Sequence, residues 1–111
     1  MADVLELSPQ HLAQWIASGQ PHTLLDVRNE SELEHASIPG ALHIPMHEVQ
    51  HRVREIPRGK PIVVMCHLGE RSWRIARFLV TDGFADVYNL EGGIDAYSVM
   101  ADSSVPRYAG R

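Results

Sequence analysis

The chain has 111 residues with a single cysteine; 44% of its residues are apolar, 22% are charged, and its formal net charge is −4. This length predicts one globular domain, and the lone cysteine excludes an intramolecular disulfide, a Cys-x-x-Cys redox pair and a multi-cysteine zinc site. The basic residues are scattered and no apolar run approaches the ~20 residues of a membrane helix, so we expect no nucleic-acid or membrane partner. The acidic N-terminus lacks a charged-then-apolar leader, which predicts a cytoplasmic protein.

Strand and helix patterns alternate through the first half of the chain. Ser8 is a suitable N-cap and Pro9 suits the first helical position, so a helix should begin there and stop at Gly19. Asn29, with Glu32 three residues later, resembles a capping box and predicts a short helix. The expected elements are strand 5–7, a helix from 9 to about 19, strand 23–27, a short helix from 29, strand 41–44 and a helix from 45 to about 54.

The second half contains the clearest strand, residues 61–65, which is uniformly apolar and is therefore expected to be buried on both faces of a parallel sheet. The later expected elements are a helix from Ser72 to about Gly83, a strand at 86–90, a turn at 91–93 and a helix at 94–100. Residues 102–111 have no periodicity. We therefore divide the chain into a domain, residues 1–101, and a surface or mobile C-terminal tail, residues 102–111.

The alternation predicts an α/β fold, a small parallel β-sheet flanked by helices on both faces. In such sheets ligands bind beyond the carboxyl ends of the strands, and Cys66 directly follows strand 61–65. Residues 66–72 join this strand to a helix N-terminus, whose unpaired N–H groups are partly positive. Gly69 lets the loop curl so that its N–H groups converge on a Cys66 thiolate beside Arg71. A buried structural cysteine is the alternative, but these coinciding features favour a nucleophile.

The length of this loop separates two kinds of chemistry. Four residues lie between Cys66 and Arg71, so the loop has six members when both ends are counted. Cysteine phosphatases use a Cys-x5-Arg loop, which is one residue longer and is sized for a phosphate group. The shorter loop suits a single extra sulfur atom, and it favours a sulfur carrier over a phosphatase or an arsenate reductase.

An ordered set of motifs covers nearly the whole chain: Leu25-Asp26-Val27-Arg28, Glu32-Leu33, Ile38-Pro39-Gly40-Ala41 with Ile44-Pro45, Cys66-x-x-Gly69-x-Arg71-Ser72, and Leu90-Glu91-Gly92-Gly93 with Ala96-Tyr97. In this order and at these spacings they resemble the signature of the rhodanese family. The sequence departs from that signature at four positions, which we expect to be structural. Where the family commonly has an aromatic residue, glycine, histidine and tryptophan, this sequence has Leu33, Ala36, Ser37 and Tyr97, respectively.

The resemblance implies a sulfurtransferase that acts by double displacement without a metal or organic cofactor. The Cys66 thiolate would take a sulfane sulfur from thiosulfate or a related small-molecule donor and pass it to a thiol, to cyanide or to an acceptor protein. Arg71 would bind the anionic donor and stabilise the thiolate, while Asp26 and Arg28 would brace the loop. The remaining candidate substrate-binding residues are His67, Leu68, Gly69, Glu70 and Ser72. Many thiosulfate-using relatives have basic residues in this loop, so the acidic Glu70 argues against thiosulfate as the physiological donor.

Several of these side chains have a second interpretation. Arg71 could form only a surface salt bridge, and Ser72 could either donate its hydroxyl to the sulfur or act only as an N-cap. His67 could tune the thiolate when protonated, although we favour a solvated side chain. Trp73, at the start of the following helix, is expected to pack against the sheet.

Three histidines, His43, His47 and His51, recur every four residues, which is a weak metal-binding pattern. No carboxylate or cysteine completes an evident site, so we expect no metal. The non-enzymatic alternative is a catalytically weak docking module of the same family, and the presence of Cys66 and Arg71 counts against it.

Overall fold

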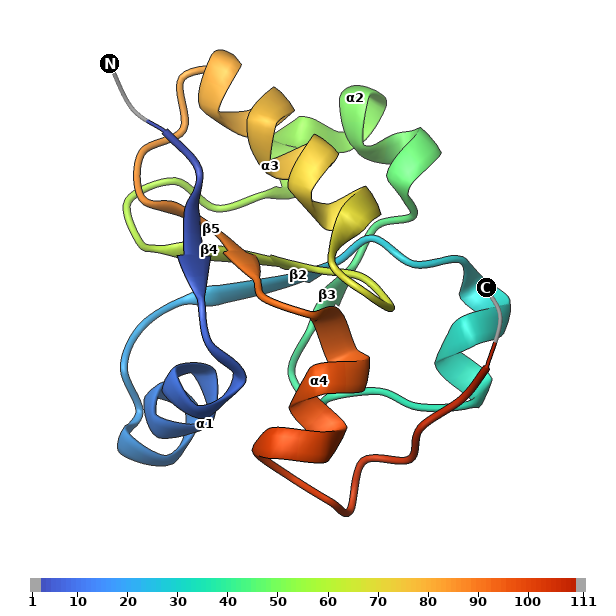
Figure 1. Ribbon diagram of the computed structural model, residues 1–111. Coiled ribbons are helices and arrows are strands. Elements are labelled where there is room, and N and C mark those ends of the chain that lie inside the picture. Colours follow the sequence, from blue (N-terminus) through green and yellow to red (C-terminus); the bar gives the residue numbers. More distant parts are fainter. Residues whose placement is uncertain (1–2, 110–111) are drawn as a thin grey trace.

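The computed structural model describes residues 3–109 and contains a five-stranded sheet in the order β1-β5-β4-β2-β3 (Figure 1). All neighbouring strands are parallel. The strands are β1 Leu5–Leu7, β2 Thr23–Asp26, β3 Leu42–His43, β4 Ile62–Met65 and β5 Val87–Leu90. Because β4 lies between β2 and β5, the strand that leads into Cys66 is at the centre of the sheet.

Helices cover both faces of this sheet (Figure 1). On one face lie α2 Val49–Arg52 and α3 Glu70–Thr81, and on the other lie α1 Pro9–Ser18 and α4 Gly93–Met100. Three short 3-10 helices complete the structure, Glu30–Glu34, Met46–Glu48 and Val53–Glu55. The predicted α/β class, with a small parallel sheet between helices, is confirmed. Among residues 3–109, no helix is both long and apolar enough to cross a membrane.

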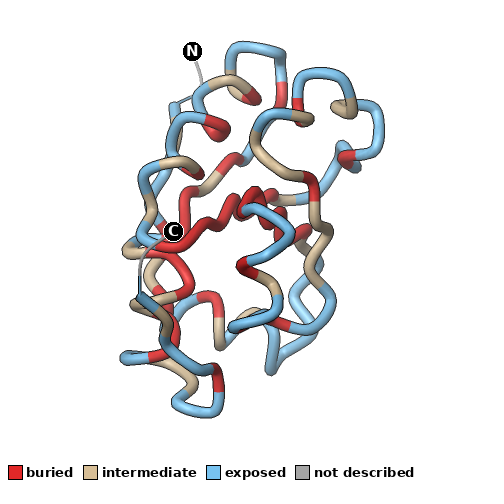
Figure 2. Tube along the Cα trace, turned by 90° about the vertical axis from the view of Figure 1, so that its right-hand side faces the viewer, coloured by how far each residue is buried: buried red, intermediate tan, exposed pale blue. Residues whose placement is uncertain are grey.

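The central strand explains why both faces are covered. Ile62 and Val64 belong to the hydrophobic core beneath α2 and α3, whereas Val63 and Met65 belong to the core beneath α1 and α4. Successive side chains of a strand point to opposite faces, so a strand that is apolar at every position needs a packed layer on each side. Figure 2 shows the buried segments running through the middle of the molecule with exposed segments around them.

The predicted ends of the first helix and the predicted start of the second are confirmed. The Ser8 hydroxyl accepts a hydrogen bond from the His11 N–H at 3.1 Å, Pro9 is the first residue of α1, and Gly19 ends it with a φ of 73°. The Asn29 N–H donates to the Glu32 carboxylate at 3.2 Å, as a capping box requires.

Two other boundaries differ from the prediction. The helix expected from Ser72 begins at Glu70, because Gly69, with a φ of 100°, already turns the chain into the helix. The helix expected from residue 45 to about 54 is divided into three short pieces. Glu48 and Arg52 interrupt it, with φ values of −103° and −118° that depart from helical geometry.

The surface location predicted for the segment after residue 101 is wrong for part of it. Val105 is buried in the core beneath α1 and α4, and its carbonyl accepts a hydrogen bond from the Ser98 hydroxyl of α4. Tyr108 is half-buried and packs against the same core. Residues 102–109 therefore return across the domain, because their apolar side chains find partners that are distant in the sequence. Residues 110–111 of the predicted tail lie outside the described residues.

Candidate active site

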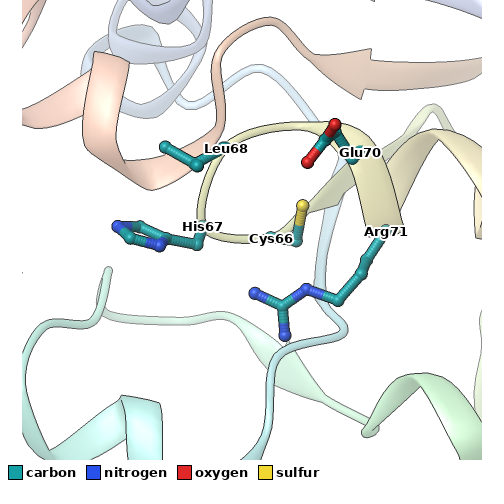
Figure 3. Close-up of a pocket in the computed structure, with 5 residues that line it drawn as sticks. All are labelled: Cys66, His67, Leu68, Glu70 and Arg71. Carbon is teal, nitrogen blue, oxygen red and sulfur yellow. The ribbon is translucent and has the colours of Figure 1, made fainter. Parts of the chain in front are cut away.

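Cys66 lies at the carboxyl end of β4 and is 1% exposed, with its sulfur inside the curl of the following loop (Figure 3). The Gly69 N–H donates to Sγ at 3.1 Å, and the Ser72 hydroxyl lies 3.3 Å from Sγ. The N-terminus of α3, which begins at Glu70, closes the curl. The partial positive charge of a helix N-terminus and the donated N–H therefore both lie next to the sulfur.

The loop keeps this shape because α4 is docked directly against it. The N–H groups of Ile94 and Asp95 donate to the carbonyls of Cys66 and His67 at 2.9 and 3.1 Å. A Cβ at Gly93 would collide with the His67 carbonyl, so only glycine permits this approach. The Gly-Gly pair before α4 thus has a structural purpose, which is to bring α4 against the Cys66 loop.

Ser72 is the third residue of α3, and Gly69 occupies the N-cap position, so the N-cap role considered for Ser72 is wrong. Its hydroxyl donates to Asn89 Oδ1 at 2.5 Å while also lying against Cys66 Sγ. A hydroxyl has one hydrogen, so a protonated Cys66 can donate to Ser72 while Ser72 donates to Asn89. The Asn89 amide in turn donates to the Gly69 carbonyl at 3.2 Å and to Glu6 of β1. These contacts fasten the loop to β5 at the centre of the site.

Arg71 forms a bidentate ion pair with Glu32. Further hydrogen bonds join this pair to Tyr108 and Arg28, and we call these four side chains the charge network. Arg71 Nη1 donates to Glu32 Oε1 at 2.7 Å and its Nη2 donates to Oε2 at 3.0 Å. The Tyr108 hydroxyl donates to Oε2 at 2.7 Å, and the Asn29 N–H donates to Oε1. Arg28 Nη1 donates to the Tyr108 oxygen at 3.2 Å. The salt bridge considered for Arg71 therefore exists, but its partner is a buried carboxylate, 2% exposed, rather than a surface group.

The charge state of this network follows from its contacts. Burial acts to raise the pKa of Glu32, but hydrogen bonds from Arg71, Tyr108 and the Asn29 backbone outweigh it and lower that pKa to about 2. Burial raises the pKa of Tyr108 to about 12; donation from Arg28 opposes this rise and the Glu32 carboxylate supports it. The hydrogen bond to Glu32 also raises the pKa of Arg71. At neutral pH the network consists of an ionised Glu32, a neutral Tyr108 and a charged Arg71.

His67 does not have the solvated position we favoured. It is 5% exposed, its ring stacks on Tyr108 with centroids 4.0 Å apart, and its Nε2 donates to the Tyr108 carbonyl at 2.9 Å. In Figure 3 the ring points away from the Cys66 sulfur. The return of residues 102–109 provides the aromatic partner that buries this histidine.

The loop encloses a pocket of about 30 Å³ lined by Cys66, His67, Leu68, Glu70 and Arg71 (Figure 3). This volume holds about one or two water-sized groups. Leu68 is 53% exposed at the edge of the pocket, and Glu70 is an exposed acid of the first turn of α3. The structure thus brings all seven predicted site residues, including Gly69 and Ser72, together around one sulfur.

Other sequence predictions have mixed outcomes. Asp26 and Arg28 form a fully buried ion pair with a 2.7 Å contact and do not line the pocket, as expected. Arg28 also donates to Tyr108, so its side chain reaches the charge network, and bracing of the Cys66 loop itself stays a prediction. Trp73 does not pack against the sheet as expected; it is 46% exposed, because the third and sixth positions of α3, Ser72 and Ile75, face the interior instead.

The three histidines spaced at four residues do not converge on one point. His43 Nε2 lies 2.7 Å from the Arg28 carbonyl, His47 lies near Glu48, and His51 is exposed. Among the described residues no three His, Cys, Asp or Glu side chains form a cluster that could hold a metal ion.

Sequence reasoning missed two side chains of this site, Asn89 and Tyr108. Asn89 interrupts the apolar pattern of β5, and a polar residue in a central strand is a signal that could have been followed. Tyr108 had no such signal, because it lies in a segment without periodicity. Glu32 was recognised as a cap and as part of a family motif, but its pairing with Arg71 joins positions 39 residues apart.

The fold and the site define a class of protein: a small parallel α/β domain with a buried cysteine cradled at a helix N-terminus. Residues 8–99 match the rhodanese-like domain family, and this chain belongs to that family. It is 36% identical to a sulfurtransferase of Allochromatium vinosum, an alignment that covers 86% of this chain and 89% of that protein.

Two further comparisons agree with this assignment. The chain is 37% identical to the thiosulfate sulfurtransferase GlpE of Pseudomonas syringae, with 70% of this chain and 74% of GlpE covered. The crystal structure of a rhodanese-related protein from Thermoplasma volcanium matches with a TM-score of 0.79 and 29% identity, covering 87% of this chain and 93% of that one. The predicted family is confirmed, and the homologues of this chain are sulfurtransferases.

Proposed function

We propose that this protein is a sulfurtransferase that moves a sulfane sulfur from thiosulfate or a related donor to a thiol or cyanide through a persulfide on Cys66. The observation that supports it is the small pocket at the sulfur: Cys66 Sγ receives the Gly69 N–H at 3.1 Å beside a cavity of about 30 Å³. A cavity of this size suits one added sulfur atom. The proposed catalytic residue is Cys66, and the cytoplasm is its proposed location.

In the first half-reaction, the Cys66 thiolate attacks the outer sulfur of thiosulfate. A bond forms between the two sulfurs, the bond from the outer sulfur to the sulfonate sulfur breaks, and sulfite leaves with that electron pair. The persulfide anion then occupies the pocket, where the Gly69 N–H and the N-terminus of α3 stabilise its charge. Neither a metal nor an oxidant is needed to balance this step.

In the second half-reaction, cyanide or a thiolate attacks the outer sulfur of the persulfide. The sulfur–sulfur bond breaks, thiocyanate or a new persulfide leaves, and the Cys66 thiolate is restored. Because Cys66 is the only cysteine of the chain, the sulfur passes directly to an external acceptor rather than to a second internal thiol.

The charges around the pocket bear on the choice of donor. Both terminal nitrogens of Arg71 are engaged by Glu32, so the positive charge is already balanced, and Glu70 adds an unbalanced negative charge at the pocket. A dianionic donor such as thiosulfate therefore gains little electrostatic attraction at this site. We expect thiosulfate to serve as a donor with weak affinity and a less charged persulfide donor to react more efficiently.

The experiment that tests this function compares the native protein with Cys66→Ser in a thiocyanate assay with thiosulfate and cyanide. We expect thiocyanate from the native protein only, with a rate that saturates in both substrates. Equal rates from the two proteins would exclude a role for Cys66. Phosphate release from an aryl phosphate by the native protein alone would instead indicate a phosphatase.

A further inference from the structure

The pocket around Cys66 is too small to hold the rest of an organic sulfur acceptor. Its volume of about 30 Å³ leaves little room beside the transferred sulfur atom. The carbon skeleton of an attacking thiol must therefore lie outside the loop, next to the edge that Leu68 forms. The surface next to Leu68 is therefore the place where the carbon skeleton of an acceptor would bind.

A second pocket, of about 450 Å³, lies directly beside the first. It is lined by His67, Leu68, Asp95, Arg107, Tyr108 and Ala109. His67 and Leu68 line both pockets, so the two cavities are neighbours that share these side chains as a wall. The volume falls within the range of about 300–1,000 Å³ typical of small-molecule sites, and it far exceeds what cyanide or sulfite needs.

One wall of this second pocket is preformed by the segment that returns across the domain, which lies beyond the residues matched to the family. Tyr108 is held by its stack on His67, by its hydroxyl contact to Glu32 and by the hydrogen bond from Arg28. A wall fixed by buried contacts costs little ordering entropy when a ligand binds.

The polar groups of the second pocket point to the chemistry of its ligand. Arg107 is oriented by two bonds to Asp95, from Nε at 2.9 Å and from Nη2 at 3.0 Å, which leaves Nη1 for a further acceptor. His67 donates from Nε2 to the Tyr108 carbonyl, so in the neutral ring Nδ1 is an acceptor. This Nδ1 is buried and has no hydrogen-bond partner among the described residues, so the accessible cationic group that the pocket offers a ligand is Arg107.

We propose that the second pocket binds the organic part of the acceptor, a low-molecular-weight amino-acid or peptide thiol whose carboxylate pairs with Arg107. This inference rests on the proposed sulfurtransferase function and names the acceptor class for it. The acceptor thiolate attacks the outer sulfur of the Cys66 persulfide, the sulfur–sulfur bond breaks, and the Cys66 thiolate leaves as the acceptor becomes a persulfide. Leu68 and the ring of Tyr108 provide apolar contact for the carbon skeleton.

The kinetic test compares glutathione with its diethyl ester, which keeps the thiol and loses the carboxylate charges. With thiosulfate as donor, we expect kcat/KM for glutathione to exceed that for the ester by about two- to fivefold, the range of one partly exposed ion pair. Arg107→Gln should bring this ratio to about one, and Arg107→Lys should restore part of it. A matched control is Arg74→Gln, an exposed arginine of α3 outside both pockets, which should keep the native ratio.

A binding test separates this inference from the proposed function. S-methylglutathione, which cannot accept sulfur, is titrated into the native protein and Arg107→Gln while the amide NMR signals of Leu68 and Ala109 are followed. We expect both signals to shift in the native protein and the apparent affinity to fall in the variant. Unchanged signals, or a glutathione preference that survives in Arg107→Gln, would overturn the pocket assignment. Failure to form thiocyanate with cyanide would count against the function alone, because cyanide needs no second pocket.

Discussion

The contacts to the Cys66 sulfur come from consecutive residues, 66–72, whereas the charge network beside it joins Arg71 of that stretch to two distant parts of the chain. Two contacts to the sulfur, from Gly69 and Ser72, lie within the loop itself. The charge network instead joins Glu32, Arg71 and Tyr108, which reach the site from a 3-10 helix, α3 and the C-terminal segment. The groups that contact the sulfur are therefore specified by one short stretch of sequence. The charges beside the sulfur depend instead on how the fold brings distant segments together.

Gly93 provides one of the long-range contacts that hold the loop, and its removal should have the largest effect. In Gly93→Ala the new Cβ meets the His67 carbonyl at a φ of 67°, so we expect a loss of roughly 4 kcal/mol in stability. Gly40→Ala is the control, because its φ of 87° is also positive but no atom lies within 4 Å of its Cβ. That variant should lose only about 1 kcal/mol. Equal losses in urea denaturation would show that α4 does not hold the loop.

Glu32 tests the charge network through the pH dependence of stability. Its pKa is lowered from 4.5 to about 2, so the ionised form stabilises the fold above pH 4.5 and that contribution is lost as pH falls toward 2. The shift corresponds to about 3 kcal/mol at neutral pH. We therefore expect Glu32→Gln to be destabilised by about this amount at pH 7, and the difference from the native protein to shrink as urea denaturation is repeated down to pH 3.5.

The control for Glu32 is Glu55→Gln, which removes a carboxylate from an exposed ion pair with Arg52. It should change stability little at any of these pH values, because solvent screens an exposed pair. A stability difference for Glu32→Gln that stays constant from pH 7 to 3.5 would contradict the buried-network account.

Tyr108→Phe should have a smaller effect, since it removes one hydroxyl and keeps the ring stacked on His67. We expect a loss of about 1 kcal/mol in stability, because the buried Glu32 carboxylate loses one of its hydrogen-bond donors. Tyr88→Phe, in β5, is the matched control, since its ring also packs against another aromatic side chain, Trp15, and lies outside the charge network. If both variants behave alike in urea denaturation, the Tyr108 hydroxyl does not stabilise the charge network.

Glu70→Gln is expected to have the smallest effect and the opposite direction. Removing this exposed negative charge at the pocket should raise kcat/KM for thiosulfate by about two- to threefold at low ionic strength. The gain should fade as salt is added, because exposed charges are screened. A decrease in kcat/KM would show that Glu70 contributes to the reaction rather than repelling the donor.

The success of prediction from sequence follows the same division between local and distant contacts. The uniformly apolar run before Cys66 and Gly69 after it were sufficient to predict a central strand, a curled loop and a helix after the loop, although this helix begins two residues earlier than expected. The pairing of Glu32 with Arg71 and the return of Tyr108 onto His67 were not predictable, because each depends on how the completed sheet brings separate segments together. For His67 the failure had a definite cause, since the residue that buries it is 41 positions away.

The central claim is that Cys66 carries a sulfur atom, and intact mass spectrometry tests it most directly. Native protein and Cys66→Ser are each incubated with thiosulfate or an organic persulfide, and their masses are read before and after cyanide is added. We predict the mass of one additional sulfur atom on the native protein only, lost again when cyanide yields thiocyanate. No adduct with any donor, or the same adduct on Cys66→Ser, would contradict this account.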